Sequence, residues 1–139
     1  YYNLLVDIVN ECRASGAALV VLLTGHNGPT QEHMVRRVAA EFNDAAGSEI
    51  VYATNDLELL RREQELPGGH GGLYEALMAE AFQEGLVNLD EMPEDQEKHC
   101  CGGRFTRADF DVERGKRFMA RSAELVAAQV KARLKALQA

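Results

Sequence analysis

A chain of 139 residues is long enough to form one domain with a sizeable hydrophobic core. Hydrophobic residues make up 46% of the sequence and charged residues 27%, which is ordinary for a globular protein in water. The net charge of −7 argues against broad binding to nucleic acids, whose phosphate backbone requires clustered Lys and Arg. The longest apolar run, Ala17 to Leu23, is far too short to cross a membrane.

The first third of the chain alternates helix and strand patterns. Residues 2–15 place apolar side chains at every fourth position, which predicts an amphipathic helix that ends at Gly16. The continuously apolar run 17–23 is typical of a parallel strand that is covered on both faces. Pro29 then suits the first turn of a second helix. The buried stripe of that helix is expected to contain Met34, Val35, Val38, Ala39 and Phe42.

The rest of the chain has a second strand and further helices. Residues 56–65 fit either a short helix or an irregular insertion, and residues 86–109 have little pattern. The clearer expectations are a turn at 43–48, a strand at 49–54, a Gly-rich loop at 66–72, a helix at 73–84 that ends at Gly85, and a long helix at 112–137.

Strands that alternate with helices predict an α/β fold with a mainly parallel sheet. We find neither an internal repeat nor a second domain, so residues 1–139 are expected to form a single α/β domain. The three cysteines are Cys12, Cys100 and Cys101, an odd number that gives no disulfide framework. We therefore expect a cytoplasmic protein.

His26 lies just beyond the end of the first predicted strand, between Gly25 and Gly28. In open α/β sheets, ligands bind outside the carboxyl ends of the strands, and the small neighbours allow close approach. A neutral imidazole at this place is a good ligand for zinc or manganese. The alternative is a loop histidine that only forms local hydrogen bonds.

His70 and Glu75 flank the start of the helix predicted at 73–84. Glycines on both sides of His70 indicate an exposed imidazole that could move protons near neutral pH, although an incidental loop histidine fits equally well. Glu75 could bind a metal, but an acidic residue in the first turn of a helix also simply complements the helix dipole.

Other chemically suggestive residues are less informative. Glu32 and His33 fall in the first turn after Pro29, where capping or surface positions are expected. Cys100 and Cys101 are adjacent, and adjacent cysteines rarely chelate one ion well. The loop at 25–28 matches neither a Walker A motif nor a dinucleotide-binding motif, because the required Lys and Gly residues are absent.

Taken together, these segments resemble the creatininase family, the creatinine amidohydrolases. Thr24-Gly25-His26-Asn27-Gly28-Pro29 is similar to that family's Asn-Gly-His-Gly-Gly-Asn loop between a strand and a helix. His70-Gly71-Gly72-Leu73-Tyr74-Glu75-Ala76-Leu77 is similar to its His-Ala-Gly-x-x-Glu-Thr-Ser segment. The stretch 84–90, the loop 102–105 and the helix entry 113–117 follow in the family's order, although the Asp-Pro of the loop is missing.

The resemblance implies a three-layer α/β/α fold and two divalent metal ions, Zn²⁺ or Mn²⁺. By position, His26 and Glu75 would be metal ligands, His70 would transfer a proton to the leaving nitrogen, and Gly71 and Gly72 would contact the substrate. A metal-bound water would attack a small-molecule amide. The replacement of the Thr-Ser pair by Ala76-Leu77 is a departure at the site itself.

The family's Glu-x-His segment and its bridging Asp come from a region that precedes these motifs. We therefore expect this chain to be the C-terminal portion of a creatininase-like domain, incomplete at its N-terminus. An N-terminal segment or a second chain would complete the site in a homo- or hetero-oligomer, because a catalytic zinc needs about three protein ligands.

The leading hypothesis is a metal-dependent hydrolase of a non-peptide or cyclic amide C–N bond. The alternative is a structural or binding subunit that keeps the fold without catalysis. A third hypothesis, a phosphate-binding module that uses the helix start after residue 28, lacks any complete phosphate motif.

Overall fold

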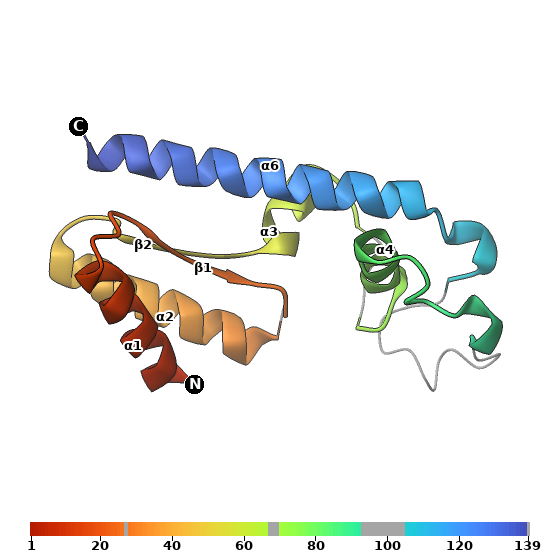
Figure 1. Ribbon diagram of the computed structural model, residues 1–139, viewed down its shortest axis with the longest axis horizontal. Coiled ribbons are helices and arrows are strands. Elements are labelled where there is room, and N and C mark those ends of the chain that lie inside the picture. Colours follow the sequence, from red (N-terminus) through yellow and green to blue (C-terminus); the bar gives the residue numbers. More distant parts are fainter. Residues whose placement is uncertain (27, 67–69, 93–104, 139) are drawn as a thin grey trace. The chain divides into compact units, whose positions relative to one another are not determined.

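The computed structural model describes residues 1–26, 28–66, 70–92 and 105–138 (Figure 1). The chain divides into two compact units. The first comprises Tyr1–Leu59 with Glu124–Ala139, and the second comprises Leu60–Ala123. Helix α6 (Val112–Leu137) contributes its first half to the second unit and its second half to the first. The single domain expected from the sequence stays a prediction, and each unit is described by itself.

The first unit is built on a parallel strand pair, which confirms the α/β class. Strands β1 (Val20–Thr24) and β2 (Val51–Asn55) pair with Val20 opposite Val51 and Thr24 opposite Asn55. The strand β1 begins later than the apolar run that predicted it. The reason is that the carbonyls of Ala17 and Ala18 accept hydrogen bonds from the Arg13 guanidinium, at 2.5 and 3.0 Å, and so belong to the turn after the first helix.

Helices α1 (Tyr2–Ala14) and α2 (Pro29–Ala46) cover one face of this pair (Figure 1). The predicted stripe of α2 is confirmed, since its members are buried or packed against the core. The helix α2 runs through the expected turn at 43–48 and ends at Gly47, whose positive φ of 65° suits glycine. The buried core comprises Leu5, Val9, Val20, Leu22, Val35, Val38, Ala39 and Val51.

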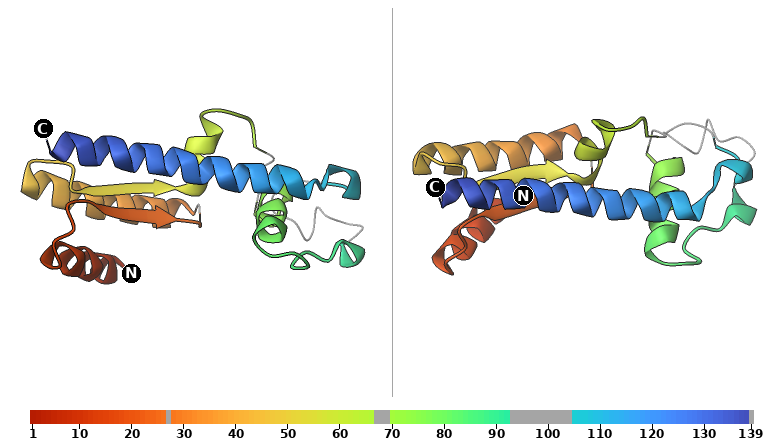
Figure 2. Two further views of the ribbon diagram at one scale, coloured as in Figure 1. Left: turned by 45° about the horizontal axis from the view of Figure 1, so that its top comes forward. Right: turned by 90° about the horizontal axis from the view of Figure 1, so that it is seen from above.

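The opposite face of the strands is covered by the second half of α6. Side chains alternate along a strand, so Tyr52 points away from the α1 and α2 side. The Arg133 guanidinium lies 3.7 Å from the Tyr52 ring centroid and donates a 3.0 Å hydrogen bond to Glu49. Figure 2 shows residues 124–137 running along the strands on the side opposite α1 and α2.

The second unit packs α4 (Leu73–Phe82) against the first half of α6. The ring centroids of Tyr74 and Phe118 are 5.6 Å apart, and Gly115 lies against the backbone of α4. A Cβ on Gly115 would come within 2.3 Å of the Leu77 carbonyl oxygen, so the two helices touch through their main chains.

Shorter elements complete the described chain. Helix α3 (Asp56–Arg61) crosses the boundary between the units and shows that the ambiguous segment 56–65 begins as a helix. Two 3₁₀ turns, η1 (Leu89–Glu91) and η2 (Arg107–Asp109), lie in the second unit. None of the helices formed by the described residues is both long and apolar enough to cross a membrane.

Candidate functional site

Polar side chains gather where the two parallel strands end. Thr24, Thr54 and Asn55 are all buried, with relative exposures of 7%, 3% and 4%. The Asn55 amide donates to the Glu32 carboxylate at 2.7 Å, and its oxygen accepts from the Glu58 backbone N–H at 2.6 Å. The carboxyl edge of the sheet is therefore a polar corner next to the N-terminus of α2, in which Asn55 is hydrogen-bonded and the buried Thr24 hydroxyl has no partner among the described residues.

His26 lies at this corner, in the short loop between β1 and α2, and is exposed. Its imidazole folds back over Gly28, the residue that precedes α2. A Cβ on Gly28 would lie 2.4 Å from His26 Nε2, so the ring occupies space that only glycine leaves empty. Asn27, between them, lies outside the described residues.

In the second unit, His70 and Glu75 lie together at the start of α4. The Gly71 backbone N–H donates to Glu75 Oε2 at 2.7 Å, and His70 Nδ1 lies 3.8 Å from the same oxygen. The His70 side chain is 76% exposed and that of Glu75 is 49% exposed. Both candidate residues therefore face solvent, and Glu75 is oriented by the loop that carries His70.

The two glycines expected to contact substrate have definite backbone roles. Gly71 has a positive φ of 67°, a conformation that suits glycine, and its N–H is used by Glu75. Gly72 is buried at the N-cap of α4, where its carbonyl accepts from the Ala76 N–H at 3.1 Å. Their contact with a substrate stays a prediction.

A family model described as Creatinine amidohydrolase matches residues 1–130. The chain belongs to the creatininase family. The match includes His26, His70 and Glu75, and it confirms the resemblance seen in the sequence. No curated protein matches the chain, and no solved structure does.

Members of the creatininase family are typically metal-dependent, and a divalent ion would need ligands from the candidate residues. Imidazole and carboxylate groups suit zinc and manganese in their chemistry. His26 belongs to the first unit, whereas His70 and Glu75 belong to the second. Within the described segments, no group of three His, Cys, Asp or Glu side chains could hold a metal. The candidate residues are therefore of types that bind metals. A catalytic metal needs about three protein ligands, however, and the described residues do not bring three together.

Asn55 and Glu32 are the members of the polar corner that sequence reasoning missed. Glu32 was expected at a capping or surface position, but its carboxylate is bound by Asn55, 23 residues away. The signal in the sequence was the polar pair Thr54-Asn55 at the end of a predominantly apolar strand. Polar residues at a buried strand end need partners, so the pair pointed to a polar corner.

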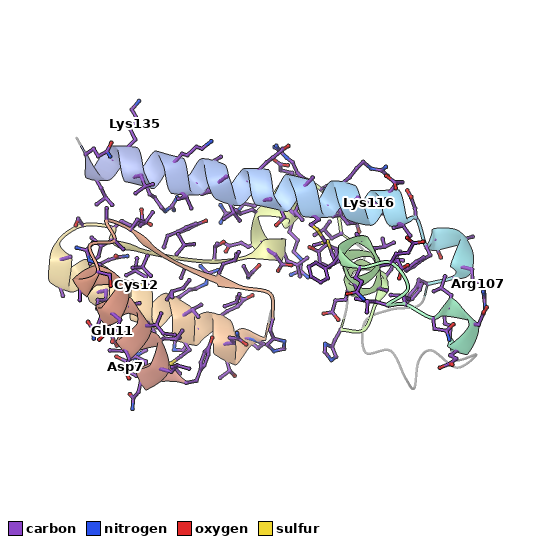
Figure 3. The ribbon with its side chains drawn as sticks, viewed as in Figure 1. Asp7, Glu11, Cys12, Arg107, Lys116 and Lys135 are labelled. Carbon is purple, nitrogen blue, oxygen red and sulfur yellow. The ribbon has the colours of Figure 1, made fainter. Side chains whose placement is uncertain are left out.

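Several charged residues elsewhere on the surface form ion pairs. Arg107 links the two 3₁₀ turns of the second unit through Asp90, at 2.8 Å, and Lys116 donates to Glu113 at 2.6 Å (Figure 3). The Glu113 carboxylate raises the pKa of Lys116. Cys12 lies on α1 with Asp7 and Glu11, and its thiol is free (Figure 3). Cys100 and Cys101 lie outside the described residues.

Proposed function

We propose that the chain is part of a metal-dependent amidohydrolase that cleaves a non-peptide or cyclic amide C–N bond. The observation that carries the proposal is the family match over residues 1–130, which includes both motifs. The contacts among His70, Gly71 and Glu75 support it, because they orient an imidazole and a carboxylate at one exposed place.

Each residue has a role that its chemistry suits. His26 and Glu75 are the proposed ligands of two divalent ions, Zn²⁺ or Mn²⁺, and such ions supply an activated water at neutral pH. His70 turns Nδ1 toward Glu75, which leaves Nε2 to carry a proton to the leaving nitrogen. Gly71 and Gly72 have no side chains, so they leave room for a small amide beside His70.

The proposal includes a partner that completes the site and the sheet. The described residues form a sheet of two strands, so within them the outer edge of β1 is unpaired, and Leu23 of this strand is 52% exposed. Parallel sheets are usually larger and covered on both faces, so a further strand is expected there. We propose that an N-terminal creatininase-like segment or second chain supplies this strand and the remaining ligands, in a homo- or hetero-oligomer with a three-layer α/β/α fold in the cytoplasm.

The alternative function is a structural or binding subunit without catalysis. The observation that favours it is that the described residues hold no group of three metal-binding side chains. Ala76 and Leu77, which replace the family's Thr-Ser pair beside Glu75, point in the same direction.

Hydrolysis by the natively purified protein tests the proposal. Creatinine and a panel of small cyclic amides are incubated with it, and ring opening is detected by mass spectrometry as the gain of one water. We expect His70→Ala to lower kcat/KM by at least about 100-fold, since general acid–base groups contribute that much. His26→Ala and Glu75→Ala are expected to lower it at least as much, because each removes a proposed ligand of the ions that activate the water.

Two exposed residues of the same types serve as matched controls. His33 lies in the first turns of α2, and Glu84 follows α4. His33→Ala and Glu84→Ala are expected to retain full activity. If the wild-type protein hydrolyses none of the amides, or if the three site variants match the controls, the catalytic proposal fails and the non-catalytic alternative stands.

A further inference from the structure

The outer face of α1 carries apolar and acidic side chains that remain exposed. Leu4 and Ile8 are 58% and 43% exposed, although large aliphatic side chains are mostly buried in folded proteins. Asp7 and Glu11 are exposed as well, and neither forms an ion pair with another residue that the structure describes. The four residues follow the spacing i, i+3, i+4 and i+7, which places them in one stripe along the helix. We call this stripe the α1 face.

The second half of α6 carries a complementary set of side chains. Lys131 and Lys135 are exposed, and within the described part of the chain neither has an ion-pair partner. Beside them Ala127 is exposed, and Val130 and Leu134 are half-buried. Helical spacing places the three apolar residues along one edge of a stripe and the two lysines along the other edge. We call these five residues the α6 face.

The charges of the two faces match in spacing. Asp7 and Glu11 are four residues apart on one helix, and two lysines are four residues apart on the other. Four residues span about 6 Å along a helix axis, so one register brings both pairs of opposite charges together. Burial of the two apolar edges would supply most of the free energy of such a contact, and the charges would select the partner and the register.

The order of the residues also fixes the relative direction of the two helices. Seen from the N-terminal end, the carboxylates lie on one side of the apolar edge of α1, and the lysines lie on the other side of the apolar edge of α6. Opposite sides of two helices meet when the helices run parallel, as e and g positions do in a parallel coiled coil. Asp7 is then opposite Lys131, and Glu11 is opposite Lys135.

The two faces cannot meet within one chain. The helix α1 and the second half of α6 lie on opposite faces of the strand pair (Figure 2). Asp7 points away from the strands on the α1 side, and Lys135 points away from them on the α6 side (Figure 3). A contact between the α1 face and the α6 face therefore joins two copies. Because the two faces differ, the contact repeats from copy to copy, so it closes a ring or extends a chain.

We propose that the α1 face binds the α6 face of a second copy of this chain, with the two helices parallel. A symmetric contact between two α1 faces is disfavoured, because it would place carboxylates against carboxylates, and two α6 faces would likewise oppose their lysines. The inference goes beyond the proposed amide hydrolysis, since the contact uses no residue of the family motifs and leaves the edge of β1 open.

Charge reversal tests the contact in the natively purified protein, with sedimentation velocity over a range of protein concentrations as the measurement. We expect the wild-type protein to form oligomers of more than two protomers, and added salt to weaken them because the ion pairs are exposed. Asp7→Lys combined with Glu11→Lys is expected to weaken association by at least about 10-fold. Lys131→Glu combined with Lys135→Glu is expected to do the same.

A chain that carries all four substitutions has its charges exchanged between the two faces. Opposite charges then meet again, so we expect this variant to associate as the wild-type protein does. The two single-face variants are also expected to associate with each other when they are mixed, because each supplies the charge that the other has lost. A general effect of net charge would not produce either recovery.

Two exposed positions outside the contact serve as matched controls. Asp44 lies in the last turn of α2, and Asp44→Lys changes the net charge by as much as Asp7→Lys does. Leu86 lies in the second unit and is 52% exposed, close to the 58% of Leu4. We expect Asp7→Lys and Leu4→Ala to weaken association, the latter by about 10-fold, and Asp44→Lys and Leu86→Ala to leave it unchanged.

Three results would overturn the proposal. They are a wild-type protein whose protomers do not associate at any concentration, single-face variants that associate like the wild-type protein, and a folded four-substitution variant that does not regain association. Circular dichroism establishes that each variant is folded. None of these variants changes His26, His70 or Glu75, so hydrolysis of the amide panel is decided separately.

Discussion

The His26 corner of the first unit and the His70–Glu75 corner of the second place candidate residues by different means. The loop of His26 is held by a strand register and by Asn55, contacts between residues far apart in sequence. Glu75 is held by the N–H of Gly71, only four residues away, on a helix that Gly115 holds close to α6. The first corner therefore depends on the sheet, and the second depends on one turn and one helix contact.

The largest expected effect is on the second corner. At Gly115→Ala, helix propensity alone would stabilise α6 by about 1 kcal/mol. The added Cβ would meet the Leu77 carbonyl oxygen at 2.3 Å, so we expect destabilisation of about 1–3 kcal/mol instead, because backbone atoms cannot move aside cheaply. Chemical denaturation followed by NMR of both units measures it.

The effect of Gly115→Ala is expected to stay within the second unit. Signals of α4 and of the His70 loop should broaden or shift, whereas those of β1 and β2 should stay. Ala120→Val, at an exposed position of the same helix, is the control and should cost less than about 1 kcal/mol. Equal stability of Gly115→Ala and the wild-type chain would show that α4 and α6 are not in main-chain contact.

Gly28→Ala tests the first corner without disturbing the backbone. Its φ of −70° is ordinary, so the added Cβ is unstrained but collides with His26 Nε2. We expect the exposed ring to move away from residue 28, with a change in stability below about 1 kcal/mol. Gly25→Ala is the control, since its Cβ would meet nothing within 4 Å. NMR of the His26 ring protons measures the movement, and equal signals in both variants would contradict the contact.

Gly71→Ala is expected to act on the second corner through backbone conformation. The positive φ of 67° is disfavoured for alanine, and the variant should lose about 1–2 kcal/mol of stability together with the Glu75 hydrogen bond. Asn tolerates this conformation better, so Gly71→Asn should lose less. Thermal unfolding measures the stability of both variants. Identical melting temperatures for Gly71→Ala and Gly71→Asn would argue against the left-handed geometry.

The smallest effect concerns an exposed ion pair of the second unit. Arg121 donates two hydrogen bonds to Glu63, at 2.6 and 2.8 Å, and lowers the pKa of that carboxyl. The pair therefore adds stability above the unfolded-state pKa, and this is lost as pH falls through the lower folded-state pKa. Glu63→Gln should melt below the wild-type chain by under about 4 °C at pH 7, with the difference vanishing in acid. A difference that persists in acid would contradict this.

Local patterns predicted most of the elements but not the contacts that link them. The stripe of α2 and the bounds of α6 follow from helical periodicity, and both are confirmed. The start of β1 was predicted too early, because Arg13 binds carbonyls that an apolar run alone would assign to the strand. Asn43 looked like a turn residue, yet it bonds Val51 from within α2.

The same holds for the candidate site, where residues in local motifs could be predicted and residues in long-range contacts could not. His26, His70 and Glu75 stand out because glycines surround them or because they match family motifs. Asn55 and Glu32 do not stand out, since their hydrogen bond joins residues that only the fold brings together. The ring contact of His26 with Gly28 likewise depends on a loop path that composition cannot specify.

The most direct test of the account is the metal content of the natively purified protein, measured by elemental mass spectrometry with every subunit identified by intact mass. We predict about two zinc or manganese ions per protomer, a further polypeptide or segment that completes the site, and loss of metal in His26→Ala and Glu75→Ala but not in His33→Ala. A metal-free wild-type protein, or site variants that keep their full metal content, would contradict the central claim.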